Sequence, residues 1–338
     1  MRKINDLQQY LVEKDFSQIF LLVDENTSKH CLPILLEKVD EISDKQAILL
    51  EIPSGEENKT LATVENICKS LLESNADRNS VLISLGGGVI TDIGGFVASI
   101  YKRGIQNINI PTTLLAMIDA SIGGKTGVDL CGVKNSIGTF NNDTISFLDT
   151  EFLGTLDKRE IMNGVAEMLK TFLVADKDYT EKLIGKKTFD TIENDFIWRC
   201  IKIKETIVEQ DFHDKDARKV LNFGHTLGHA FESCFLQEQK LLHGEAVAIG
   251  MYYALKLSEI KQRNKNLFLE NIFLFLEKNF VILDLHKNLP ALLPFVKNDK
   301  KAFKDVVYFV LLKDIGVPVI NVPVDLDKDL ASINCNNL

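Results

Sequence analysis

The sequence has no pair of cysteines spaced as Cys-x-x-Cys, and its six cysteines are scattered along the chain. A structural zinc site would normally supply such pairs. Scattered cysteines are typical of proteins from a reducing compartment, where thiols stay free. We therefore expect free thiols and no cysteine-based metal site.

An excess of positive charge and a long apolar run are also missing. The chain carries 39 Lys and Arg against 48 Asp and Glu, a net charge of −9. This balance argues against a nucleic-acid partner, which needs a basic face, although a local basic pocket stays possible. No apolar run approaches the roughly 20 residues of a membrane span, and the first residues lack the apolar core of a signal peptide. We expect a cytoplasmic protein without membrane association.

The first half of the chain alternates short apolar runs with helical patterns. Strands are predicted at 19–24, 46–52, 80–85 and 108–110, and helices at 28–39, 60–73 and 92–101. This β-α-β-α order predicts a mostly parallel sheet with helices on both faces, a Rossmann-like arrangement.

From about residue 157 the pattern changes to long helical segments. Helices are predicted at 159–175, 189–210, 218–235, 244–261 and 267–279, followed by a hairpin of strands at 305–312 and 317–322. With 338 residues, of which 45% are apolar, the chain can form two cores. We predict an α/β dinucleotide-binding domain over 1–155 and a mainly α-helical metal- and substrate-binding domain over 156–338.

A glycine-rich turn follows the predicted strand at 80–85. Gly86, Gly87 and Gly88 would let a ligand approach the backbone, and the following helix would offer its N-terminal N–H groups to a pyrophosphate. The pattern is neither Gly-x-Gly-x-x-Gly nor a P-loop, so a simple tight turn stays an alternative. Asp92 could cap the helix or touch a cofactor. Thr112 and Thr113 follow a strand end, where ligands bind in open α/β sheets.

Half of the six histidines fall within residues 225–243. Arg218, Asn222, His225 and His229 are spaced four, three and four apart, which on one helix places all four on one face. His243 follows in a His-Gly-Glu turn. Such a stripe suits a metal beside an anionic ligand, although surface histidines are a common alternative.

A carboxylate and several cations could complete this site. Glu167 and Lys170 stand three apart in an apolar setting, which would be unusual for the alternative, a surface salt bridge. We predict a catalytic metal held by Glu167, His225 and His243, which leaves one position open. The surrounding cations would suit a substrate with phosphate and carboxylate groups, although a loop lysine is usually just solvated; they are Lys125, Lys134, Lys170, Lys204 and Arg218.

The chain resembles the 3-dehydroquinate synthase family over roughly residues 19–305. The resemblance is carried by many separate motifs that occur in order: Gly-Glu-Glu-Asn-Lys at 55–59, Gly-Gly-Gly-Val-Ile-Thr-Asp at 86–92, Tyr-Lys-Arg-Gly at 101–104, Pro-Thr-Thr-Leu-Leu at 111–115, Asp-Ala-Ser-Ile-Gly-Gly-Lys-Thr at 119–126, Lys-Asn at 134–135, Ala-Glu-Met-Leu-Lys at 166–170, Leu-Asn-Phe-Gly-His-Thr-Leu-Gly-His-Ala at 221–230 and Leu-His-Gly-Glu at 242–245.

The resemblance implies a homodimeric enzyme that uses NAD and a divalent metal, Zn²⁺ or Co²⁺. The implied reaction converts 3-deoxy-D-arabino-heptulosonate 7-phosphate to 3-dehydroquinate and phosphate. It proceeds by transient oxidation, β-elimination of phosphate, re-reduction and aldol closure. A chain acting in this way is a lyase of the shikimate pathway.

The resemblance also assigns residues to roles. NAD contacts are implied for Asp24, Asn26, Glu56, Lys59, Gly87, Gly88, Val89, Asp92, Thr112, Thr113, Asp119 and Thr155. Substrate contacts are implied for Arg103, Lys125, Lys134, Asn135, Lys170, Lys204, Arg218, Asn222, His229 and either Lys300 or Lys301, of which we favour Lys301. Catalytic roles fall to His229, Lys125, Asp119, Lys170 and Asn135, and Arg103 is expected to come from the partner subunit.

Asp214 departs from the family pattern, since it stands where a glutamate is common. Three other functions stay open at this point: another sugar-phosphate cyclase of the inosose or valiolone type, a metal-dependent polyol dehydrogenase of the glycerol dehydrogenase type, and a non-catalytic sensing module. The density of cations and the presence of Arg218, Asn222 and His229 favour 3-dehydroquinate synthase.

Overall fold

The computed structural model describes residues 1–131, 133–235, 241–262, 268–298, 302–303, 306–326, 328–330 and 332–333. The chain divides into two compact units, Met1–Ile161 and Met162–Leu338. In the described part of the chain, every cysteine is a free thiol. None of the described helices combines the length and the apolar character that crossing a membrane requires.

The first unit is built on a six-stranded parallel sheet. Its strand order is β1-β8-β5-β4-β2-β3, with bounds β1 Arg2–Lys3, β2 Ile19–Asp24, β3 Ile48–Ile52, β4 Val81–Gly86, β5 Gln106–Pro111 and β8 Ile145–Leu148. Every residue of β4 is buried, as expected for a strand covered on both faces. The predicted parallel sheet is confirmed, and β2 has the predicted bounds.

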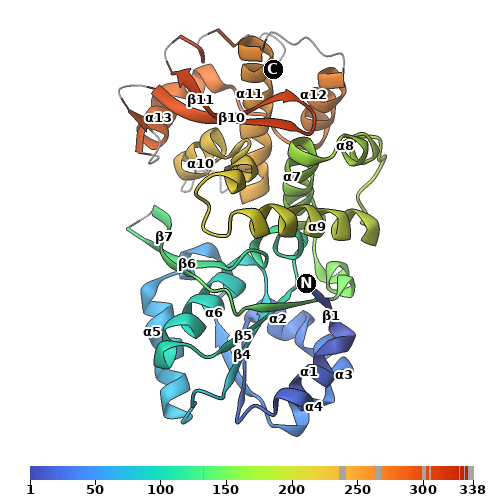
Figure 1. Ribbon diagram of the computed structural model, residues 1–338, viewed down its shortest axis with the longest axis vertical. Helices are drawn as coiled ribbons and strands as arrows, with labels where there is room; N and C mark the ends of the chain where they lie inside the picture. Colours follow the sequence, from blue (N-terminus) through green and yellow to red (C-terminus); the bar gives the residue numbers. More distant parts are fainter. Residues whose placement is uncertain are drawn as a thin grey trace. The chain divides into compact units, whose positions relative to one another are not determined.

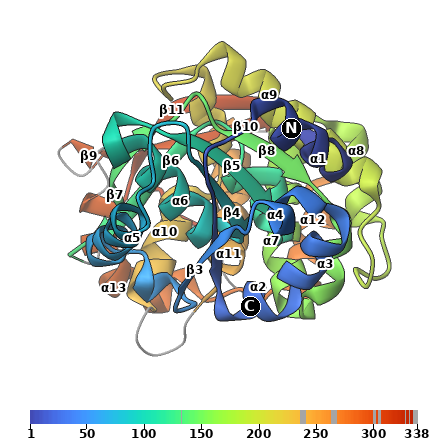
Figure 2. The same ribbon diagram turned by 90° about the horizontal axis from the view of Figure 1, so that it is seen from below.

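Helices cover both faces of this sheet (Figures 1 and 2). They are α1 Leu7–Lys14, α2 Glu25–His30, α3 Leu32–Lys38, α4 Asp40–Asp44, α5 Leu61–Glu73 and α6 Gly88–Ile100. Alternate residues of β2, Phe20 and Leu22, pack with Ile67 of α5 and Ile93 of α6 in one buried cluster. On the other face, Tyr10 of α1 packs against Phe147 of β8.

The glycine-rich stretch after β5 folds into a hairpin that the sequence did not reveal. A π-helical turn, Ala116–Ala120, leads into the antiparallel pair β6 (Lys125–Leu130) and β7 (Val133–Phe140). The residues of β7 are exposed or half-buried, so this strand is only partly covered. The hairpin fixes the register of Lys125, Lys134 and Asn135, which a loop would leave unspecified.

The second unit is mainly helical, as predicted. Its helices are α7 Lys158–Ala175, which begins in the first unit, then α8 Lys177–Ile184, α9 Asn194–Gln210, α10 His225–Cys234, α11 His243–Gln262, α12 Phe268–Asn279 and α13 Leu285–Asn298. The predicted hairpin is present as β10 (Val306–Asp314) and β11 (Val317–Asp325), with the short strand β9 (Ala302–Phe303) beside β10.

The predicted continuous helix over 218–235 is wrong. A 3-10 helix, η6 (Ala217–Asn222), ends before Gly224, which has φ 79°, and α10 begins only at His225. This left-handed conformation suits glycine and interrupts the helix. Gly224 also packs against α11, because a Cβ on Gly250 would lie 1.9 Å from the Gly224 carbonyl oxygen.

Candidate active site

A carboxylate and two imidazoles from three helices meet in the second unit. Glu167 lies on α7, His225 opens α10, and His243 opens α11. Glu167 Oε1 lies 3.4 Å from His225 Nε2 and 3.4 Å from His243 Nε2. The structure therefore brings together the three residues predicted to hold a metal.

These distances fit a metal better than they fit hydrogen bonds. Neither contact of Glu167 Oε1 has the geometry of a hydrogen bond. In contrast, ligand atoms around a tetrahedral Zn²⁺ with bonds of about 2.1 Å stand roughly 3.4 Å apart. Glu167 is fully buried, and its Oε1 accepts no hydrogen bond of good geometry from the described residues. A cation between the three ligand atoms would satisfy this carboxylate.

In each imidazole, Nε2 faces Glu167 and Nδ1 lies beside an oxygen atom that helps to orient the ring. His225 Nδ1 lies 3.2 Å from the carbonyl oxygen of Phe223, and His243 Nδ1 lies 3.4 Å from Glu232 Oε2. Sequence reasoning missed Glu232, which is buried on α10. Its position three residues after His229, on the same helix, was the available signal.

The electrostatics of the cluster follow from its burial. Burial would raise the pKa of Glu167, but Lys170 and the two histidines hold that pKa well below its usual range. Burial lowers the pKa of His225 to about 3. For His243, burial acts in the same direction, but Glu167 and Glu232 raise its pKa to about 10.

Three cations of the predicted substrate site are buried in this unit. Lys170, Lys204 and Arg218 are 1%, 6% and 4% exposed. Lys170 Nζ lies 2.5 Å from Glu167 Oε2, so the pair is a buried ion pair rather than a surface salt bridge. Buried cations of this kind suit anionic ligands, because a charge-assisted hydrogen bond is stronger than one between neutral groups.

Arg218 lies on η6 rather than on α10, so the expectation that it shares a helix face with His225 is wrong. Its Nη1 donates to the Phe212 carbonyl oxygen at 2.8 Å, and its backbone N–H donates to Asp211 Oδ2. Asn222 ends η6, half-buried. His229 is exposed on α10, with its ring centroid 5.1 Å from that of His225.

The predicted NAD residues of the first unit gather at one edge of its sheet. Strands β2, β4 and β5 are adjacent and parallel, and they end at Asp24, Gly86 and Pro111. Ligands bind at this edge in open α/β sheets. Gly87, Gly88 and Val89 form the start of α6, Thr112 and Thr113 follow β5, and Asp24 caps α2, which carries Asn26.

A buried lysine joins predicted NAD residues to predicted substrate residues. Lys59 Nζ lies 2.6 Å from Asp92 Oδ2 and donates to Asn135 Oδ1 at 2.7 Å. Asp92 is therefore an ion-pair partner and not a helix cap. Burial would lower the pKa of Lys59, but Asp92 and Glu56 raise it, so the lysine stays charged. Nearby, Lys134 Nζ lies 3.4 Å from Glu56 Oε1.

The remaining predicted residues are more dispersed. Asp119 lies in the π-helical turn, and Lys125 is exposed at the start of β6. Thr155 ends the 3-10 helix η5 (Thr150–Thr155), with its Oγ1 3.7 Å from Cys31 Sγ. Arg103 is exposed, with φ 67°. Lys300 and Lys301 lie outside the described residues.

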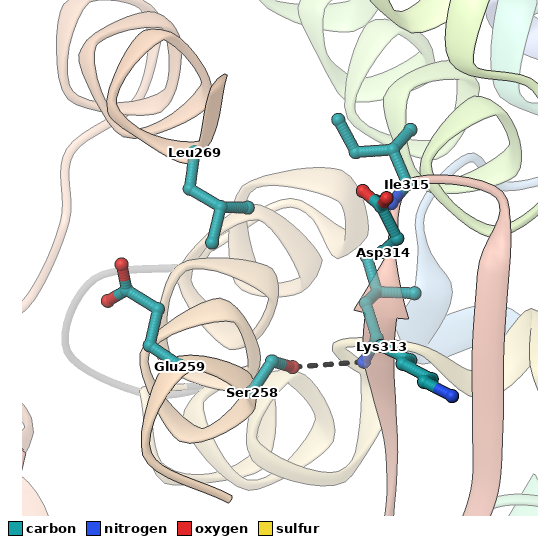
Figure 3. Close-up of a pocket in the computed structure, with 7 residues that line it drawn as sticks. Ser258, Glu259, Leu269, Lys313, Asp314 and Ile315 are labelled. Carbon is teal, nitrogen blue, oxygen red and sulfur yellow. Dashed lines mark hydrogen bonds between the residues drawn. The ribbon is translucent and has the colours of Figure 1, made fainter. Parts of the chain in front are cut away.

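One cavity of the second unit is too small to be a substrate site. It has a volume of about 20 Å³, room for roughly one water molecule. Ser258 of α11 lies against strand β10 there, where its Oγ accepts the backbone N–H of Leu312 at 3.0 Å (Figure 3). The cavity is a packing defect between α11, α12 and β10.

The fold is similar to those of solved sugar-phosphate cyclases. A 2-deoxy-scyllo-inosose synthase complexed with carbaglucose-6-phosphate, NAD⁺ and Co²⁺ has TM-score 0.82 and 25% identity, over 97% of this chain and 93% of that one. ValA, a 2-epi-5-epi-valiolone synthase from Streptomyces hygroscopicus subsp. jinggangensis 5008 with NAD⁺ and Zn²⁺ bound, has TM-score 0.77 and 25% identity, over 95% and 92%.

Sequence similarity narrows this class to one family. Residues 49–163 match the family model described as 3-dehydroquinate synthase N-terminal, and residues 164–302 match 3-dehydroquinate synthase C-terminal. A 3-dehydroquinate synthase of Parabacteroides distasonis is 37% identical over 337 residues, which cover 98% of this chain and 94% of that protein. The chain belongs to the 3-dehydroquinate synthase family, as its motifs predicted.

Proposed function

We propose that this chain is a carbon–oxygen lyase that converts 3-deoxy-D-arabino-heptulosonate 7-phosphate to 3-dehydroquinate and phosphate. The observation that carries the proposal is the meeting of Glu167, His225 and His243 at metal-ligand spacing, in a unit that also buries Lys170, Lys204 and Arg218. Membership of the 3-dehydroquinate synthase family supports the same reaction.

Glu167, His225 and His243 would hold the metal, Zn²⁺ or Co²⁺. Such an ion, when bound, polarises oxygen atoms and lowers the pKa of hydroxyl groups, and NAD supplies reversible hydride transfer. The glycines before α6, the threonines after β5, and Asp24, Asn26, Glu56, Lys59, Asp92, Asp119 and Thr155 would bind NAD.

The cations bind and orient the substrate. The guanidinium of Arg218 suits a carboxylate or phosphate, and the ammonium groups of Lys125, Lys134, Lys170 and Lys204 supply further positive charge. A polyol substrate would need few of these cationic side chains. His229, exposed next to His225, would hold or move a proton close to the reacting carbon. Asn135, Asn222 and Lys301 complete the proposed substrate contacts.

We also propose that the chain works as a homodimer in the cytoplasm, with Arg103 reaching the site of the partner subunit. The exposed position of Arg103 supports this arrangement. Light scattering on the purified protein tests the dimer, and cell fractionation tests the location.

One reaction tests the proposed function. The metal-free protein is loaded with Zn²⁺ and incubated with the heptulosonate phosphate and a trace of NAD⁺, and phosphate and 3-dehydroquinate are measured together. Equal amounts of both products, with no net NADH, are expected. The His225→Ala variant should bind no metal and form neither product.

Parallel reactions separate the alternatives. Glucose 6-phosphate lacks the carboxylate, so turnover of this sugar phosphate in preference to the heptulosonate would indicate an inosose-type cyclase. Accumulation of one NADH per turnover with glycerol would indicate a polyol dehydrogenase. Binding of NAD⁺ and metal without turnover of any of these compounds would indicate a sensing module.

A further inference from the structure

Two carboxylates flank His243, one beside each ring nitrogen. Its Nε2 lies 3.4 Å from Glu167 Oε1, and its Nδ1 lies 3.4 Å from Glu232 Oε2. Glu232 is 4% exposed and stands on α10, while Glu167 stands on α7. The imidazole that opens α11 is therefore oriented by side chains from both other helices of the cluster.

This arrangement matters because an imidazole can bind a metal only through a nitrogen that carries no proton. The acceptor on the opposite nitrogen decides where the proton sits and how the ring is turned. In His225 the acceptor is the Phe223 carbonyl oxygen, 3.2 Å from Nδ1. Both histidines thus present Nε2 to Glu167, but only His243 is oriented by a carboxylate.

We propose that Glu232 is the positioning residue of the metal centre. It keeps the proton of His243 on Nδ1, turns Nε2 toward Glu167, and adds negative charge that makes the imidazole a stronger ligand. The inference rests on the proposed metal site and adds to it a residue outside the predicted ligand set.

A direct role for Glu232 as a ligand is the competing arrangement. Suitable atoms of His229, Glu232 and His243 also lie within 4.8 Å of one another. In that arrangement His243 would bind the metal through Nδ1, and neither its Nε2 nor Glu167 would be a ligand. The two arrangements differ in the number of protein ligands lost when Glu232 is removed.

The test compares Glu232→Gln and Glu232→Ala with the wild-type protein. Metal-free protein is titrated with Zn²⁺ in competition with a chromophoric chelator, and the visible spectrum of the Co²⁺ form is recorded. Glu232→Ala should bind Zn²⁺ about 10- to 100-fold more weakly, with one ion per chain and an unchanged Co²⁺ coordination geometry. Glu232→Gln keeps an acceptor oxygen of the same shape and should recover part of the loss.

Ser258→Ala is the matched control. Ser258 is equally buried, at 4% exposure, and lies on α11 far along the helix from His243. Its hydroxyl donates to the Ala254 carbonyl oxygen on α11 and accepts the backbone N–H of Leu312 on β10. Its removal should lower the melting temperature and leave Zn²⁺ affinity unchanged. If Glu232 only stabilised the fold, its variants would likewise lower the melting temperature and leave Zn²⁺ affinity unchanged.

Each other outcome is decisive. Unchanged Zn²⁺ affinity in Glu232→Gln and Glu232→Ala would overturn the positioning role. A change in Co²⁺ coordination geometry in Glu232→Ala would overturn it in favour of a direct ligand. A wild-type protein that binds no Zn²⁺ would refute the proposed function itself, so the wild-type titration separates the two failures.

Discussion

Asn163 Oδ1 accepts a hydrogen bond of 2.6 Å from the backbone N–H of Gly244. Asn163 lies one helical turn before Glu167 on α7, and Gly244 follows His243 at the start of α11. This buried bond therefore fixes the two helices at the level of the proposed ligands. It also satisfies one of the N–H groups that a helix leaves unpaired in its first turn.

Asn163→Ala should weaken both stability and metal binding. Removing the acceptor leaves a buried N–H group unpaired, which costs about 1–3 kcal/mol. The start of α11 can then shift, which should displace His243 Nε2 from its position beside Glu167 Oε1. Urea denaturation and a Zn²⁺ titration measure the two effects, and Asn163→Asp, which keeps an acceptor, should lose less. Full Zn²⁺ affinity in a destabilised Asn163→Ala protein would contradict the link between this bond and the metal.

Arg218→Ala should weaken substrate binding and leave metal content near one ion per chain. A buried charge-assisted contact is worth roughly 1.5–3 kcal/mol, which is about a tenfold to hundredfold loss of affinity. Arg218→Lys should recover only part of the lost substrate affinity, because an ammonium group cannot make the bidentate contact. Calorimetry and metal analysis separate the effects. Normal substrate binding together with zinc loss would show that the roles have been assigned wrongly.

Asp211 should make stability depend on pH in the acid range. Its carboxylate accepts the backbone N–H groups of Lys215, Asp216 and Arg218, which lowers its pKa to about 2. A carboxyl group whose pKa is lower in the folded chain stabilises the fold above its unfolded pKa, about 4. That stabilisation is lost as the pH falls from about 4 toward 2.

Thermal unfolding of the wild-type protein and of Asp211→Asn measures this effect. The melting temperature of the wild type should exceed that of the variant at pH 6, and the difference should shrink below pH 4. A difference that stays constant from pH 6 to pH 3 would show that the charge of Asp211 is not the cause.

Arg103 should act in the site of the partner subunit. Arg103→Ala and His225→Ala should each be inactive as pure dimers. When the two variants are mixed and allowed to exchange subunits, half of the dimers are hybrids, and each hybrid contains one complete site. The mixture should therefore recover up to about a quarter of wild-type activity. No recovery in hybrids verified by mass spectrometry would place Arg103 in its own subunit or outside the site.

The sequence predicted the parallel sheet well because buried strands read as short apolar runs. The run at 19–24 forms β2 with the same bounds, and the sequence also indicates the three residues of the Glu-His-His cluster. Their roles as ligands stay predictions.

Long-range and left-handed features escaped the sequence analysis. The spacing of Arg218 and His225 predicted one helix face, but periodicity cannot reveal that Gly224 adopts φ 79° and breaks the helix. The glycines of β6 and β7 concealed a hairpin, because glycine more often marks turns. Glu232 and Asn163 gained their importance from contacts across the fold, which local patterns do not report.

The close contact between Gly224 and Gly250 changes what an alanine scan of this enzyme would report. Such a scan assumes that alanine is the smaller residue and that substitution deletes an interaction. At Gly250 a methyl group would lie 1.9 Å from the carbonyl oxygen of Gly224, the residue before His225. Alanine at this position would therefore force α10 and α11 apart. A large loss of activity at this position would mark a residue with no side chain and no ligand contact, whose contribution is the space it leaves empty.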